Sequence, residues 1–175
     1  MTTLFCSNKL ENFLGKTQVN SSLSKGENAL GDWNGHLFTS NRKNYLIFVN
    51  NKSYYSVILE NIKKTDIKNL EYIFINRLVC QLVHDKVIEN SDSLVIVHKI
   101  LPVTCSKTNN DKKTLGTLND FVSQIKYGFN SSEWVNKKLT HINGYVNQTP
   151  TGAGKNESRR YGMPIQDMKD LINLI

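Results

Sequence analysis

A stripe of apolar residues at helical spacing between Ile67 and Val83 is the strongest periodic pattern in this chain. The apolar positions follow steps of three and four residues and widen into a broad face. They are Ile67, Leu70, Ile73, Phe74, Leu78, Val79, Leu82 and Val83. Because a helix with so broad an apolar face must cover another apolar layer, the pattern predicts a helix over residues 66–88 that packs on a sheet. Thr65 or Asp66 is suited to begin it.

Short apolar runs of β-forming residues predict that sheet. Residues 45–49 and 54–59 are two such runs, and the polar segment 50–52 between them is typical of a β-hairpin turn. The other expected strands cover residues 3–6, 33–39 and 94–103. Pro102 marks the end of the last strand or places it at an edge of the sheet.

Further helices are predicted from apolar spacing and from residues that favour helix ends. They cover residues 8–14, a segment that begins at Thr117, a segment from Asn130 to Val146, and a last helix from Pro164. Thr117 is followed by Asp120 after three residues, and Asn130 by Glu133, as in a capping box. The polar segments 15–32, 104–113 and 151–162 are expected to be loops.

These elements predict an α+β fold, with a small, mostly antiparallel sheet and helices packed mainly on one side of it. The chain has 175 residues, which is the size of one ordinary domain. It shows no internal repeat and no interdomain linker. We therefore expect residues 1–175 to form a single domain.

Several classes of protein and site are disfavoured. No apolar run approaches the roughly 20 residues of a membrane-spanning helix, and the N-terminus lacks the pattern of a secretory signal. We therefore expect no membrane partner and a cytoplasmic location. The cysteines Cys6, Cys80 and Cys105 are far apart and odd in number, which favours reduced thiols. The histidines lack metal-ligand spacing and residues 151–155 do not complete a phosphate loop, so we predict no metal and no cofactor.

The chain is basic, with 22 Lys and Arg against 15 Asp and Glu and a net charge of +7. The excess is steepest between Thr104 and Arg160, which favours RNA, DNA or another polyanion as partner. The candidate nucleic-acid-binding residues are Lys107, Lys112 and Lys113 in one basic loop and Lys155, Arg159, Arg160 and Tyr161 in another. Guanidinium groups can bind phosphate with two hydrogen bonds, and a tyrosine ring can stack on a base. The alternative is that the two loops are separate and only solvated.

Seven short segments occur in an order that resembles a known family. They are Leu-Phe-Cys-Ser-Asn-Lys-Leu (4–10), Gly-Asp-Trp-Asn-Gly-His-Leu (31–37), Leu-Ile-Phe-Val-Asn-Asn (46–51), Ser-Val-Ile-Leu (56–59), Lys-Thr-Leu-Gly-Thr-Leu-Asn-Asp-Phe (113–121), Val-Asn-Gln-Thr-Pro (146–150) and Met-Pro-Ile (163–165). The series resembles a family of small prokaryotic proteins described as domain of unknown function 6933. The chain departs from the family pattern at Gly35, where the family has a bulkier residue, and in a longer segment between Pro150 and Pro164.

The resemblance implies a shared architecture and no particular activity. The residues that it places in that architecture are Lys9, Trp33, Asn119, Asp120, Thr149 and Pro150. The first four of them are candidates for a polar pocket. The alternative for Trp33 is core packing, and the alternative for Asp120 is stabilisation of a helix N-terminus.

Three functions are consistent with the sequence. The first is a non-catalytic, cytoplasmic domain that binds nucleic acid or another polyanion through its basic loops. The second is a protein-binding regulatory module of a mobile-element or phage-defence system. The third is a small hydrolase or nuclease, which would need a pocket that joins Asn119 and Asp120 to a histidine. The sequence favours a protein without catalysis and leaves its oligomeric state open.

Overall fold

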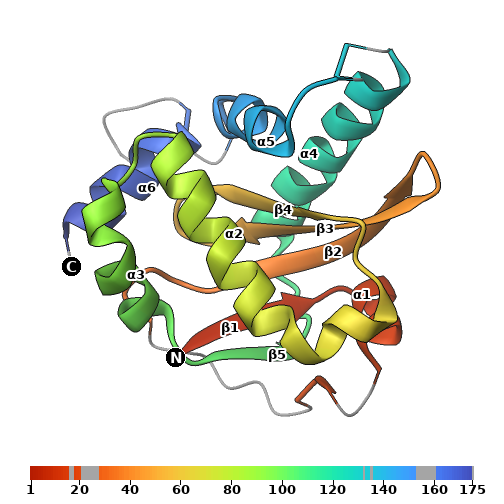
Figure 1. The fold of residues 1–175 in the computed structure, drawn as a ribbon, viewed down its shortest axis with the longest axis horizontal. Coiled ribbons are helices and arrows are strands. Elements are labelled where there is room, and N and C mark those ends of the chain that lie inside the picture. The colour runs from red at the N-terminus through yellow and green to blue at the C-terminus, as the bar shows by residue number, and fades with distance from the viewer. Residues whose placement is uncertain (16–17, 21–27, 132, 135, 153–160, 175) are drawn as a thin grey trace.

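The computed structural model describes residues 1–15, 18–20, 28–131, 133–134, 136–152 and 161–174. Its centre is a five-stranded sheet with the strand order β4-β3-β2-β1-β5 (Figure 1). The strands are β1 (Thr2–Cys6), β2 (Trp33–Ser40), β3 (Lys43–Asn50), β4 (Ser56–Glu60) and β5 (Val103–Lys107). β1 runs parallel to both β2 and β5, whereas β2, β3 and β4 form an antiparallel meander with most of the paired residues.

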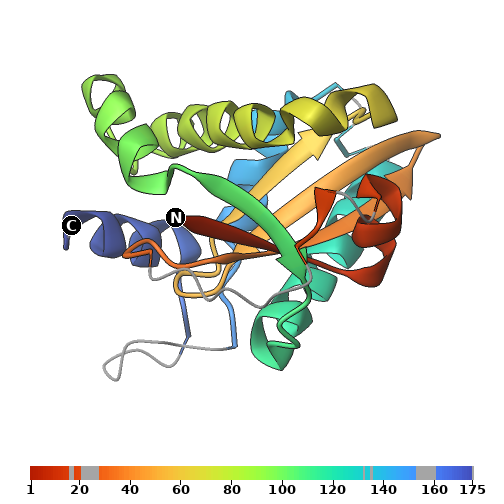
Figure 2. The same cartoon turned by 90° about the horizontal axis from the view of Figure 1, so that it is seen from below.

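Helices cover both faces of the sheet, and more of them belong to one face (Figures 1 and 2). The α-helices are α1 (Asn8–Leu14), α2 (Leu70–His84), α3 (Ser93–Ile100), α4 (Lys112–Asn130), α5 (Leu139–Asn147) and α6 (Pro164–Asn173). The first three and α6 contribute buried residues to one apolar cluster, and α4 and α5 contribute to the other. The α+β class that the sequence predicts is therefore confirmed.

Strand β3 shows why the sequences of the central strands are continuous apolar runs. Leu46 and Phe48 face the α2 side of the sheet, and Tyr45, Ile47 and Val49 face the α4 side. Because both faces are covered, both sets of side chains are buried, and the usual alternation of polar and apolar residues is lost. Strand β4 pairs with β3 as the predicted hairpin.

Three of the predicted helices form where the apolar spacing places them. The helix predicted over residues 8–14 is α1, with the same bounds. The stripe between Ile67 and Val83 forms α2, preceded by a 3-10 helix over Lys64–Asn69. Leu70, Phe74, Leu78 and Leu82 are buried on its inner face, as the spacing requires. The last helix, α6, begins at Pro164, because proline at the first helical position loses no hydrogen bond there.

The predicted strand over residues 94–103 is wrong, because residues 93–100 form α3. The run is rich in β-branched residues, which favour strands. Its buried residues, however, are spaced as on one face of a helix. Ile96 and Ile100 are buried four residues apart, whereas Leu94 is 72% exposed. Tertiary packing therefore overrides the local β preference, and the strand, β5, begins only at Val103.

The predicted loop over residues 104–113 and the predicted helix starts after it are also wrong. Residues up to Lys107 belong to β5, and α4 begins at Lys112 instead of Thr117. The Asp111 carboxylate accepts hydrogen bonds from the backbone N–H groups of Lys113 and Thr114, at 3.1 and 3.2 Å, and so caps the helix. The helix predicted from Asn130 begins only at Leu139, as α5.

Helix α5 covers the outer edge of β4 with two asparagine side chains. The Asn143 Oδ1 atom accepts from the Ile58 N–H at 2.9 Å, and the Asn147 Oδ1 atom accepts from the Ser56 N–H at 2.8 Å. The two asparagines are four residues apart and therefore lie on the same side of α5. They replace the hydrogen bonds that a further strand would make, which protects this edge from pairing with another chain.

The same polar cluster contains the buried carboxylate of Asp85. It accepts hydrogen bonds from the Tyr55 hydroxyl at 2.6 Å, from the Gln81 amide at 3.0 Å and from the Asn147 amide at 3.1 Å. Burial, and then the negative charge of Asp85, raise the pKa of Tyr55 well above its ordinary value, so this phenol stays protonated. The cluster joins α2, β4 and α5, which fixes the position of α5.

Candidate functional site

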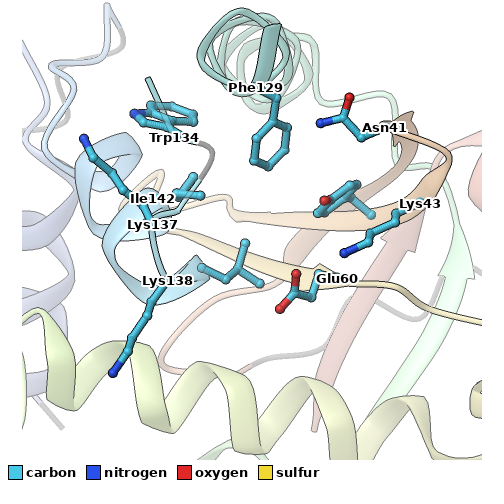
Figure 3. A pocket seen from close by; sticks show the side chains of 10 residues that line it. Asn41, Lys43, Glu60, Phe129, Trp134, Lys137, Lys138 and Ile142 are labelled. Atoms are coloured by element: carbon cyan, nitrogen blue, oxygen red, sulfur yellow. The ribbon is translucent and has the colours of Figure 1, made fainter. Parts of the chain in front are cut away.

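A pocket of about 280 Å³ lies where α4 ends and α5 begins, and we call it the aromatic-lysine pocket (Figure 3). Its lining residues are Asn41, Lys43, Tyr45, Glu60, Phe129, Trp134, Lys137, Lys138, Leu139 and Ile142. They come from the turn between β2 and β3, from β3, from the end of β4, and from the end of α4 through the start of α5. The pocket is therefore assembled from segments that are far apart in the sequence.

Three aromatic rings form one wall of the aromatic-lysine pocket. The ring centres of Tyr45 and Phe129 are 5.3 Å apart, and those of Phe129 and Trp134 are 6.1 Å apart. Gly128 makes this arrangement possible, because a Cβ atom at that position would lie 2.4 Å from the Trp134 ring. The side chain of Tyr145, on α5, also contacts Trp134, with 5.7 Å between the ring centres.

The lining of the aromatic-lysine pocket is cationic, with three lysines and one glutamate. Lys43 and Glu60 lie on one side of it, and Lys137 and Lys138 lie on the other (Figure 3). Within the described residues none of the three lysines forms an ion pair, so their charges are available to an anionic ligand. Burial, and then the charge of Glu60, raise the pKa of Tyr45, which therefore keeps its hydroxyl proton as a hydrogen-bond donor.

A second pocket, of about 270 Å³, lies beside the middle of α4 and the segment that follows α5. We call it the threonine pocket; it is lined by Thr117, Asp120, Phe121, Gln124, Thr149, Pro150, Thr151 and Gly152. The Gln124 amide donates to the Thr149 hydroxyl at 3.1 Å, which ties α4 to this segment. The Thr151 hydroxyl is buried and has no hydrogen-bond partner within the described residues.

None of the predicted nucleic-acid-binding residues that the structure describes lines the aromatic-lysine pocket. Lys107 lies on β5, with its Nζ atom 4.0 Å from a carboxylate oxygen of Glu11. Lys112 and Lys113 are exposed in the first turn of α4, about 25 Å by helical rise from Phe129 at its other end. Tyr161 is also exposed. The remaining candidates, Lys155, Arg159 and Arg160, lie outside the described residues.

The four candidates for a polar pocket do not come together. Trp33 is buried on the α2 face of the sheet, where its ring centre lies 5.4 Å from that of Phe74. Asn119 and Asp120 are exposed on α4, which covers the opposite face, and Lys9 is exposed on α1. Of the four, Asp120 alone lines one of the two pockets, and no histidine is among the described residues that line either one.

Sequence reasoning missed the residues of the aromatic-lysine pocket. Trp134, Lys137 and Lys138 lie in a short aromatic and basic segment, which is a weak signal for nucleic-acid binding. The apolar spacing predicts a helix over this segment, which would place its side chains on helical faces, whereas α5 begins only at Leu139. Lys43 and Phe129 carry no signal of their own, because only the fold brings them to this segment.

The chain resembles a known family in two of the segments that form the threonine pocket. The model of a family described as Domain of unknown function (DUF6933) matches residues 3–167. The chain belongs to the DUF6933 family. Two of the segments through which it resembles DUF6933, residues 113–121 and 146–150, meet at the threonine pocket and supply Thr117, Asp120 and Thr149 to it. No curated protein and no solved structure matches the chain.

Among the helices that the structure describes, none is long and apolar enough to cross a membrane. The described residues also contain no group of three or more His, Cys, Asp or Glu side chains placed to hold a metal ion.

Proposed function

We propose that this DUF6933 protein binds single-stranded nucleic acid, without catalysis, by taking a base into the aromatic-lysine pocket. The observation that supports this most is that the Tyr45, Phe129 and Trp134 rings, which pack on one another, line the same hollow as three lysines. Aromatic rings bind bases by stacking, with about 1–3 kcal/mol for each base. Lysines at the rim bind the phosphates on either side of a stacked base.

The shape of the pocket favours a single strand over a duplex. Its rings line a concave hollow, so a base must leave its stack and its pairing partner to reach them. A single strand makes its bases available at little cost, whereas a duplex must first be opened. The lysines alone would bind either form, because phosphate contacts carry no information about strandedness.

Neutralising the pocket lysines should weaken binding of a single strand at least about tenfold at low salt and make the binding less salt-dependent. The variant carries Lys43→Gln, Lys137→Gln and Lys138→Gln. Its matched control carries Lys107→Gln, Lys112→Gln and Lys113→Gln, which removes the same number of charges from the surface favoured by the sequence. The measurement is fluorescence anisotropy of labelled oligonucleotides of about 12 nucleotides, single-stranded and duplex, from about 0.05 to 0.3 M NaCl.

The proposal predicts that the wild-type protein and the control bind the single strand with similar affinity, and that the duplex binds more weakly. Loss of binding in the control but not in the pocket variant would place the site at Lys107, Lys112 and Lys113 and overturn the proposal. Absence of binding by the wild-type protein at the lowest salt would overturn it as well.

A further inference from the structure

The threonine pocket differs chemically from the aromatic-lysine pocket. Among the described residues of its lining, Asp120 is the only charged one, and its carboxylate accepts hydrogen bonds without donating any. The Thr151 hydroxyl, buried there without a partner in the described part of the chain, can both donate and accept. A lining of this kind attracts hydroxyl or amino groups and repels phosphate.

The two pockets lie at opposite ends of α5. Leu139, at the start of the helix, lines the aromatic-lysine pocket, and Thr149, just beyond its end, lines the threonine pocket. The helical rise over the nine residues of α5 is about 12 Å. At the roughly 3.4 Å per nucleotide of a stacked strand, this distance corresponds to about three to four nucleotides. A bound single strand of only a few more nucleotides than this can therefore occupy both pockets at once.

Exposed aromatic side chains accompany the two pockets. Tyr145 lies between them on α5, is 51% exposed and contacts Trp134. Tyr127 follows Gln124 by three residues, so it lies on the same side of α4 as that residue of the threonine pocket, and it is 71% exposed. Rings at these positions can stack on the bases of a strand that runs from one pocket to the other.

We infer that the threonine pocket accepts a ribose 2′-hydroxyl of the strand held by the aromatic-lysine pocket, so that the protein prefers RNA to DNA. The inference rests on the proposed function. The Asp120 carboxylate accepts the hydrogen bond from the 2′-hydroxyl, and the threonines that line the same pocket supply further polar groups beside it. DNA has no 2′-hydroxyl, so it leaves these groups without a partner.

The test compares oligouridine with oligodeoxyuridine of equal length, about 12 nucleotides. These two probes differ only in the 2′-hydroxyl, and uracil has no amino group that could reach Asp120 instead. We expect the wild-type protein to bind the RNA about tenfold more tightly, since a hydrogen bond to a charged group has about that effect. Asp120→Ala should abolish the preference by weakening RNA binding without weakening DNA binding, and Asn119→Ala, on the neighbouring exposed residue outside the pocket, should retain it.

The direction of the Asp120→Ala effect separates this inference from general electrostatics. Removing a negative charge strengthens the binding of any polyanion, so a selective loss of RNA affinity requires a specific contact. Equal affinities of the wild-type protein for the two probes would overturn the RNA preference and leave the proposed function intact. Failure of the wild-type protein to bind either probe would overturn both.

Discussion

Asn147→Leu should lower the free energy of unfolding by about 3 kcal/mol. The Asn147 side chain is fully buried and accepts from both the backbone N–H and the hydroxyl of Ser56, at 2.8 and 2.6 Å. Leucine has a similar size but no acceptor, so the Ser56 N–H remains buried without a partner, which costs about 1–3 kcal/mol. Loss of the hydrogen bonds to the Ser56 hydroxyl and to Asp85 adds to this cost.

Urea denaturation of the two proteins measures this difference directly. Asn119→Leu is the matched control, because Asn119 is exposed in the middle of α4 and should change stability by no more than about 0.5 kcal/mol. A destabilisation below about 1 kcal/mol in Asn147→Leu would contradict the view that α5 completes the hydrogen bonds of the β4 edge.

Gly128→Ala should lower the free energy of unfolding by about 2 kcal/mol and weaken oligonucleotide binding about tenfold. The new Cβ atom would lie 2.4 to 2.7 Å from three atoms of the Trp134 ring. The Trp134 ring is flat and rigid, so its three close atoms cannot shift independently of one another. The whole Trp134 side chain must therefore move away from α4. The aromatic wall of the pocket then loses its packing against Phe129.

Gly116→Ala is the matched control on the same helix. A Cβ atom at Gly116 meets nothing within 4 Å, so the substitution should stabilise α4 by up to about 1 kcal/mol and leave binding unchanged. Thermal unfolding and the anisotropy titration together separate the two effects. Unchanged binding by Gly128→Ala would show that the position of Trp134 does not matter to the ligand.

The sequence predicts those elements whose local preference agrees with their tertiary environment. In α2 the apolar spacing and the burial coincide, and in the β3-β4 hairpin the apolar runs and the polar turn coincide. In α3 they conflict, because a β-branched run is buried with helical spacing. For α4, Thr117 offers a plausible start, but Asp111 caps the helix earlier because Thr114, one turn before Leu118, is already buried.

The candidate site was less predictable, because it depends on contacts between distant segments. Asp120 and Thr149 were both singled out in the sequence, and the fold does bring them to one pocket. Their proximity depends on the hydrogen bond between Gln124 and Thr149, which no local pattern reveals. In the aromatic-lysine pocket, Lys43 lines the same hollow as Phe129 and Lys138 only because β3, α4 and α5 meet on one face of the sheet.

Photocrosslinking with an oligonucleotide that contains 5-iodouridine tests most directly whether a base enters the aromatic-lysine pocket. The halogenated base reacts on irradiation with aromatic side chains that stack on it, and mass spectrometry of the digested complex identifies the modified residue. We predict crosslinks at Tyr45, Phe129 or Trp134, which are lost when Phe129→Ala and Trp134→Ala are combined. Crosslinks confined to Tyr161, with none in the pocket, would contradict a binding site at the junction of α4 and α5.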